Sequence, residues 1–139
     1  MNVVDSSAWL EYFADGPNSR FFAPAIEEQR NLVVPSICVA EVFRRMMQQL
    51  GLEAAMRATA AMQRQGTVIE LDASLARDAG RLGVDLKLPL ADSIVYATAK
   101  ALDGTVWTQD SDFENLPNVR YREKKRQGTA RHAVAKPLR

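Results

Sequence analysis

The sequence has 139 residues, about the size of one average domain, and its composition excludes several classes of protein. Hydrophobic residues make up 47% and charged residues 25%, which excludes a disordered chain, and no apolar run reaches the roughly 20 residues of a membrane-spanning helix. A single cysteine, Cys38, and a single histidine, His132, exclude a disulfide framework and a zinc site of several thiolates or imidazoles. The N-terminus has no basic segment followed by an apolar stretch, so we expect a cytoplasmic protein without a secretory signal.

The formal net charge of +1 hides an uneven distribution of charge. Residues 1–119 contain ten Lys or Arg and sixteen Asp or Glu, whereas residues 120–139 contain eight basic residues and one acid. An acidic body with a basic tail indicates a metal site in the body or nucleic-acid contact through the tail, although a solvated tail without a partner fits equally well. Because the apolar pattern ends after Tyr121, we expect a domain over residues 1–121 and a flexible basic tail over residues 122–139.

Strands and helices alternate in the first half of the sequence. The apolar run at residues 2–4 stops at Asp5, which predicts a buried strand that enters a helix, and residues 31–36 repeat this pattern. Pro24 either begins or kinks a helix within residues 20–29. Two further helices follow, with stops at Gly51 and Gly66. Their predicted apolar faces, in which methionine fills the core, are Ala40, Phe43, Met47 and Leu50 in the first helix and Leu52, Ala55, Met56, Thr59 and Met62 in the second.

The second half of the sequence continues the alternation. Residues 67–71 predict a strand, and Asp72 is expected to cap the helix that follows it. Another helix begins near Pro89, and strands are expected at residues 105–108 and 118–121. The predicted buried stripe of that helix is Leu90, Ile94, Ala97 and Leu102. Strands that alternate with helices predict an α/β fold, a three-layer α/β/α sandwich with a mainly parallel sheet.

Acidic residues fall where this fold would bring them together. Asp5 and Asp110 follow predicted strands, Glu41 lies in the second turn of a helix that leaves a strand, and Asp92 lies in the first turn of another helix. Ligands of open parallel sheets bind at the carboxyl ends of the strands, where all four acids would lie. Unneutralised carboxylates repel one another, so the cluster predicts a divalent cation. Oxygen ligands without histidine or cysteine favour Mg²⁺ or Mn²⁺, which activate water for phosphoryl chemistry.

Each acid also has an ordinary structural interpretation. Asp5 would serve as a helix N-cap, and Glu41 would pair with Arg44 or Arg45 on a solvated helix face. First-turn acids favour the helix dipole, which would account for Asp92, and acids are common in turns, which would account for Asp110 and Asp112. The joint placement of the acids at one sheet edge favours the metal site over these separate interpretations.

Four segments together resemble the PIN-domain ribonucleases and, more narrowly, the VapC toxins of bacterial toxin–antitoxin pairs. They are VVDSSAWL at residues 3–10, VAE at residues 39–41, LPLADS at residues 88–93 and TQDSDF at residues 108–113. The segments occur in the family's order with family-like spacing, and the resemblance covers about residues 1–121. The basic tail matches no PIN motif.

The resemblance implies roles for individual residues. The acidic quartet that binds one or two Mg²⁺ or Mn²⁺ ions and carries catalysis falls on Asp5, Glu41, Asp92 and Asp110. Asp112 matches a further acid that would act as a secondary metal ligand or hold water. Ser7 and Thr108 match hydroxyl positions that hydrogen-bond to the acids and orient them.

The resemblance also implies an activity and partners. A metal-bound water would attack an RNA phosphodiester and leave a 5′-phosphate and a 3′-hydroxyl. Members of the family usually form homodimers and are inhibited by a cognate VapB antitoxin that lies over the active site. The tail would add phosphate contacts to RNA, or add nothing. Cys38 is expected to be a small core residue rather than a nucleophile.

Three alternatives stay open on the sequence. The Asp110-Ser111-Asp112 segment superficially matches phosphatases of the haloacid dehalogenase type, although Phe113 departs from that family's motif. A response-regulator receiver shares the α/β fold and an acidic pocket, but it has paired acids after its first strand, which are missing here. The third alternative is a PIN-like module that only binds a partner or regulates transcription.

Overall fold

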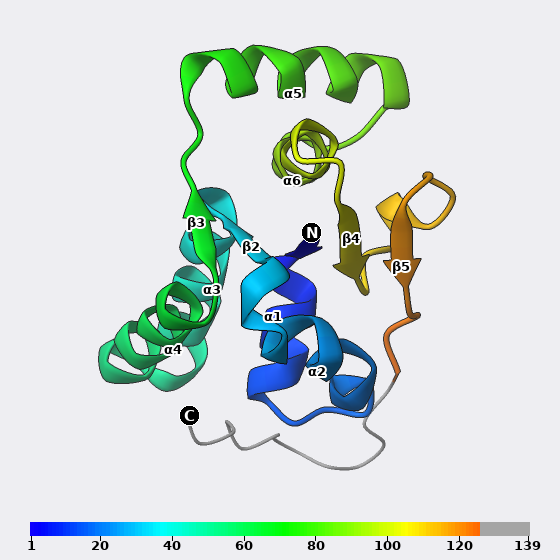
Figure 1. Ribbon diagram of the computed structural model, residues 1–139. Helices are drawn as coiled ribbons and strands as arrows, with labels where there is room; N and C mark the ends of the chain where they lie inside the picture. The colour runs from blue at the N-terminus through cyan, green and yellow to red at the C-terminus, as the bar shows by residue number, and fades with distance from the viewer. Residues whose placement is uncertain (126–139) are drawn as a thin grey trace.

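Five short strands form one fully parallel sheet at the centre of the molecule (Figure 1). The computed structural model describes residues 1–125. Val3 of the central strand lies opposite Val33 on one side and Val106 on the other, so buried valines run across the middle of the sheet. In the order β3-β2-β1-β4-β5, the strands are β3 Thr67–Ile69, β2 Leu32–Pro35, β1 Asn2–Val4, β4 Thr105–Thr108 and β5 Val119–Tyr121.

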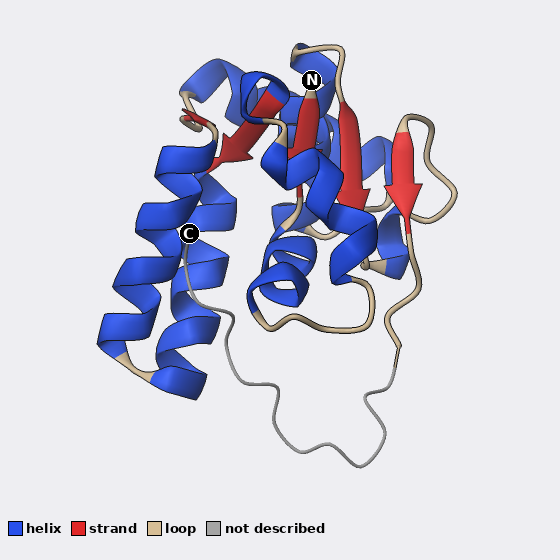
Figure 2. Ribbon diagram, turned by 60° about the horizontal axis from the view of Figure 1, so that its bottom comes forward, coloured by secondary structure: helices blue, strands red, loops and turns tan. Residues whose placement is uncertain are grey.

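Six α-helices cover the two faces of the sheet. Figure 1 shows α5 and α6 on one side of the sheet and α1, α2 and α4 on the other. Figure 2 shows α3 and α4 side by side. The α-helices are α1 Ser6–Phe13, α2 Ser19–Glu27, α3 Ser36–Leu50, α4 Leu52–Gln65, α5 Ala73–Leu86 and α6 Leu90–Ala101, and two short 3₁₀ helices are η1 Gln29–Asn31 and η2 Ser111–Phe113. The predicted three-layer α/β/α architecture is confirmed, with a sheet that is parallel throughout.

The hydrophobic core lies between the sheet and the helices on either side of it. Valine and leucine fill the strands because a parallel sheet covered on both faces buries both sides of each strand. The largest side chains with less than 2% exposure include Trp9 of α1, Phe22 and Ile26 of α2, Met62 of α4 and Phe113 of η2. This core holds the carboxyl ends of β1 and β4 at fixed positions, and the acids follow those ends.

The ends of several helices follow the local sequence as predicted. The Asp72 side chain accepts a hydrogen bond of 2.8 Å from the Leu75 backbone N–H, as expected of the N-cap of α5. Gly51 separates α3 from α4 with a φ of 95°, a conformation that favours glycine. Pro24 lies inside α2. It therefore does not begin that helix.

The predicted apolar faces of three helices are partly wrong. Met47, Leu50, Leu52 and Met56 are about half exposed, Ala40 is exposed, and Leu90 is 72% exposed. The buried residues are Cys38, Val42 and Met46 in α3 and Ala55, Ala58, Thr59, Ala61 and Met62 in α4. The buried face of α3 is therefore rotated by about one residue from the predicted face, and the errors in α4 are its exposed Leu52 and Met56. Leu90 is the first residue of α6, at the exposed end of that helix.

The predicted basic tail falls largely outside the described residues. Residues 122–125 follow β5, and the expectation for residues 126–139 lies outside the part of the chain that the structure describes. Within residues 1–125, no helix combines the length and the apolar character that crossing a bilayer requires.

Candidate active site

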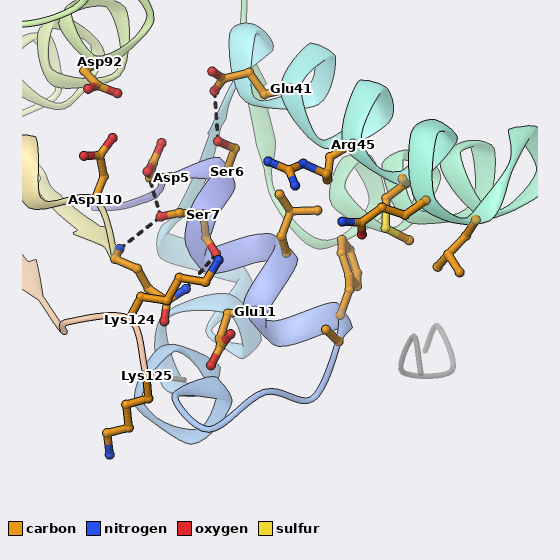
Figure 3. A pocket seen from close by; sticks show the side chains of 17 residues that line it. Asp5, Ser6, Ser7, Glu11, Glu41, Arg45, Asp92, Asp110, Lys124 and Lys125 are labelled. Atoms are coloured by element: carbon orange, nitrogen blue, oxygen red, sulfur yellow. Dashed lines mark hydrogen bonds between the residues drawn. The ribbon is translucent and has the colours of Figure 1, made fainter. Parts of the chain in front are cut away.

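Four carboxylates from separate parts of the sequence line one groove at the carboxyl edge of the sheet (Figure 3). The groove has a volume of about 960 Å³. Asp5 follows β1, Asp110 follows β4, Glu41 comes from α3 and Asp92 from the first turn of α6. The parallel connections bring these residues together, because each of these chain segments begins or ends at the same edge of the sheet.

The acids form two groups of close carboxylates. Carboxylate oxygens of Asp92, Asp110 and Asp112 lie within 4.8 Å of one another. In the second group, one Asp5 oxygen, one Glu41 oxygen and the Cys38 sulfur lie within 4.8 Å of one another. The charge of Asp110 raises the pKa of Asp5 and the pKa of Glu41, so the two groups interact electrostatically across the groove.

Asp5 occupies the N-cap position of α1, but its side chain does not cap the helix. Instead, its Oδ2 atom accepts hydrogen bonds of 2.9 Å from Ser7 Oγ and from Thr108 Oγ1. Only 3% of Asp5 is exposed, and this burial raises the pKa of its carboxyl group, although the hydrogen bonds from the two hydroxyls counteract part of the effect. The N-cap interpretation of Asp5 is therefore wrong.

Glu41 points into the groove rather than along a solvated helix face. Its Oε1 atom accepts a hydrogen bond of 2.9 Å from Ser6 Oγ. Burial raises the pKa of the Glu41 carboxyl group, and the nearby charges of Asp5 and Asp110 raise it further. No ion pair joins Glu41 to Arg44 or Arg45 in the described part of the chain, so the simple pairing along the helix is wrong.

Asp92 has the most perturbed carboxyl group of the site. Burial, followed by the charges of Asp110 and Asp5, raises the pKa of Asp92 from 3.8 to about 8. The next residue, Ser93, is fully buried, and its Oγ donates hydrogen bonds to the backbone oxygens of Leu88 and Pro89. These hydrogen bonds hold the first turn of α6, from which the Asp92 side chain extends. Burial and the nearby negative charges both disfavour the ionised form, so the Asp92 carboxyl group holds its proton more strongly than an exposed aspartate does.

Asp110 both shapes a turn and faces the groove. Its Oδ1 atom accepts a hydrogen bond of 2.9 Å from the Asp112 backbone N–H, and its own N–H donates to Thr108 Oγ1 at 2.9 Å. The turn interpretation is thus correct for Asp110 without excluding a metal role. Asp112 is exposed and does not line the groove, although its carboxylate lies beside those of Asp92 and Asp110.

The donor set of this site fits Mg²⁺ or Mn²⁺. Carboxylate oxygens are the ligands that these hard cations prefer, and burial, together with the charge of neighbouring carboxylates, raises the pKa values of Asp5, Glu41 and Asp92. The Cys38 thiol is buried, and burial raises its pKa well above the ordinary value, so it stays protonated and is a poor ligand. Asp5, Glu41, Asp92 and Asp110 could hold the ion, and Asp112 lies close enough to assist.

Several residues of the groove escaped the sequence analysis. Ser6 holds Glu41, and Gln109 donates its backbone N–H to Ser7 Oγ at 3.0 Å. The position of Ser6 beside Asp5 was the available signal. Arg45 was expected only as an ion-pair partner of Glu41, and Lys124 and Lys125 only as part of the basic tail, but all three line the groove. Nothing in the local pattern identifies the buried acid Glu11, which lines it as well.

Comparisons with known proteins identify the family and the fold. A family model described as the PIN domain matches residues 3–119. A comparison with curated protein sequences finds no match to this chain. The fold is similar to a toxin–antitoxin complex from Klebsiella pneumoniae, with a TM-score of 0.72 and 20% identity over 86% of this chain and 96% of the other.

Two further solved structures share the fold. One is VapC20 from Mycobacterium tuberculosis, described as a toxin that cleaves the sarcin-ricin loop, with a TM-score of 0.70 and 18% identity over 86% of this chain and 97% of that one. The other is VapBC2 from Rickettsia felis bound to a DNA fragment of its promoter, with a TM-score of 0.68 and 16% identity over 88% and 97%. At these identities the likeness establishes a common fold.

Proposed function

The chain belongs to the PIN domain family, and from this premise we propose that it is a metal-dependent endoribonuclease of the VapC toxin type. The observation that carries the proposal is the convergence of Asp5, Glu41, Asp92 and Asp110 on one groove, with Asp5 buried and held by two hydroxyls. The family match argues against the phosphatase and receiver alternatives. A PIN-like module that only binds a partner is the remaining alternative.

The proposed cofactor is Mg²⁺ or Mn²⁺, held by the four carboxylates with Asp112 beside them. When bound, the ion would supply a water of lowered pKa and neutralise charge on the phosphate oxygens. Ser7 and Thr108 would fix the orientation of Asp5, because both donate to the same carboxylate oxygen. Ser6 would do the same for Glu41.

An antitoxin and a second copy of the chain are the proposed partners. Two of the similar structures are described as a toxin–antitoxin complex and as a VapBC protein, which supports a VapB-type antitoxin for this chain. Apolar side chains line the groove together with the acids, and a protein segment would find hydrophobic contacts there. They are Leu10, Phe13, Ala14, Met46 and Leu50. Homodimer formation and a cytoplasmic location stay predictions from the resemblance.

The decisive experiment incubates the purified, antitoxin-free protein with total cellular RNA in Mg²⁺, in Mn²⁺ and in EDTA, and sequences the 5′-phosphate ends. We expect discrete cuts that require metal and that Asp5→Asn reduces to the level of the EDTA sample. Asp85→Asn is the control, because Asp85 is an exposed acid of α5 outside the groove. Discrete cuts by the Asp5→Asn protein would refute the site, and no cuts by the wild-type protein would favour the binding module.

A further inference from the structure

Three basic side chains line the same groove as the acids. Of the described residues around it, five are acidic, and Arg45, Lys124 and Lys125 are basic. No ion pair involves these three within residues 1–125. A cation that stays unpaired beside carboxylates is available to an anion that enters the groove.

Arg45 comes one helical turn after Glu41 on α3, a spacing that favours an ion pair between the two. Instead, the Glu41 carboxylate is held by Ser6, and the Arg45 guanidinium extends into the groove beside it (Figure 3). Guanidinium groups bind phosphate oxygens in a bidentate manner, which suits this position to a nucleic-acid backbone. The neighbouring Arg44 is also exposed but does not line the groove.

Lys124 reaches the groove from the segment after β5, and the backbone just before it is anchored. The Arg122 N–H donates to the Thr108 oxygen at 3.1 Å, and Asn18 Nδ2 donates to the Glu123 oxygen at 2.9 Å. Asn18 is only 2% exposed and also donates to Gln109 Oε1 at 2.7 Å, so the segment is tied to residues next to the acids.

The two cations reach the groove from different directions, next to the acids. In Figure 3, Arg45 and Lys124 extend from opposite sides of the start of α1, where Ser6 and Ser7 hold the carboxylates, whereas Lys125 points away from the acids. A strand of RNA whose scissile phosphate lies at the acids carries further phosphates in both directions along its backbone. Two cations in the groove of the acids, both unpaired within the described part of the chain, therefore match a polyanion that crosses the site.

We propose that Arg45 and Lys124 bind RNA phosphates that neighbour the scissile phosphate in the groove. This inference rests on the proposed ribonuclease function and names its substrate-binding residues. RNA is favoured over an acidic protein segment because the phosphates that the two cations would bind belong to the same backbone as the phosphate that the acids and their metal would cleave. Phosphate contacts position the strand without reading its sequence.

The test measures RNA binding in a protein that leaves the RNA intact. Asp92→Asn is introduced in every sample, and the affinity for a fluorescein-labelled 30-nucleotide single-stranded RNA is measured by anisotropy over a series of KCl concentrations. Arg45→Gln and Lys124→Gln are each expected to weaken binding by about five- to tenfold at low salt. Each should also reduce the slope of log K against log salt by about 0.7, the value for one lost phosphate contact.

Matched controls remove the same charge elsewhere. The controls are Arg44→Gln and Lys100→Gln. Arg44 is next to Arg45 on α3, Lys100 is near the end of α6, and neither residue lines the groove. Equal affinities and slopes for Arg45→Gln and Arg44→Gln, or for the two lysine variants, would overturn the inference. So would a loss of affinity for a poly-glutamate peptide with no change for RNA, because that result assigns the cations to a protein partner.

The wild-type protein separates this inference from the proposed function. If wild-type protein cuts total RNA and the groove variants bind RNA like their controls, only the inference fails. If the wild-type protein neither cuts nor binds RNA, the proposed function fails and the inference fails with it.

Discussion

The interior of the sheet and its carboxyl edge differ sharply although they lie on the same strands. Val3, Val4 and Val106 are fully buried among apolar side chains. The next residue after Val4 is Asp5, whose carboxylate is also buried and lies close to other acids. The interior stabilises the fold by removing apolar surface from water, whereas the edge brings like charges together and destabilises the metal-free protein. The difference indicates that the stable interior holds the edge in an unfavourable arrangement that serves binding.

The largest expected effect on stability comes from a substitution in the apolar interior. Phe22 of α2 is fully buried, so Phe22→Ala should lower the free energy of unfolding by about 3–5 kcal/mol through lost burial and a cavity. Urea denaturation with and without Mg²⁺ measures this. The loss should be the same in both conditions, because Phe22 does not line the groove.

Met56→Ala provides the matched surface control for that measurement. Met56 is 56% exposed on α4, and its replacement should change the free energy of unfolding by less than about 0.5 kcal/mol. A large loss for Met56→Ala would show that a partner, such as a second copy of the chain, covers this face in solution.

The fold could be predicted from the sequence because its signals are local. Short valine runs stopped by Asp5 or by Pro35 and Ser36 indicate buried strands that enter helices, and all five strands lie where they were expected. The faces of α3 and α4 could not be predicted in full, because both helices also carry large apolar residues that are exposed, among them Met47 and Met56. Which of several apolar faces becomes buried depends on neighbouring helices that local periodicity does not contain.

The acids of the site were also accessible from the sequence, for a different reason. Asp5 and Asp110 follow strands, and Glu41 and Asp92 lie in the first two turns of helices that begin at the same sheet edge, so topology alone brings the four acids together. Arg45 and Lys124 could not be identified in this way. Arg45 has the spacing of an ordinary ion pair with Glu41, and only the structure shows that Ser6 takes that role. The two residues before Lys124 hold it at the groove, because Glu123 accepts a hydrogen bond from Asn18 and Arg122 donates one to Thr108, and neither contact can be read from the local sequence.

A smaller effect is expected where the two regions meet, at Thr108. This side chain is fully buried at the end of β4, where it donates to Asp5 Oδ2 and accepts from the Asp110 N–H. Thr108→Val removes both hydrogen bonds at nearly constant shape. We expect a loss of about 1–3 kcal/mol in the free energy of unfolding and about 10- to 100-fold in metal affinity and RNA cleavage. Isothermal titration with Mn²⁺ and initial cleavage rates measure the functional losses.

Thr105→Val distinguishes positioning from a general effect on the strand. Thr105 begins β4 at the opposite end of the same strand, and its hydroxyl makes no side-chain hydrogen bond with the described residues. Metal affinity and cleavage should stay within about twofold of the wild type, since changes away from special features are small. If both valine variants lose metal affinity equally, Thr108 does not act through Asp5 and Asp110.

The smallest expected effect is the pH dependence that the edge imposes on stability. The pKa of Asp92 is about 8 in the folded protein, well above the ordinary 3.8, so the folded state binds more protons than the unfolded state between these two values. The metal-free protein should therefore be most stable at the acidic end of this range and lose stability as pH rises toward 8. Since Asp92 is only about half-buried, we expect a fall in Tm of roughly a few degrees.

Thermal unfolding in EDTA from pH 5 to pH 9 measures this fall, and two changes should remove it. Asp92→Asn takes away the proton-binding group, so its curve should be flatter, whereas Asp78→Asn on the exposed side of α5 should follow the wild type. Mg²⁺ should restore stability at pH 8 to 9, because it binds the carboxylates after their protons have left. A wild-type Tm that rises with pH in EDTA would contradict the repulsion between the acids. The edge would then be stable without a cation, and the contrast with the valine interior would lose its physical basis.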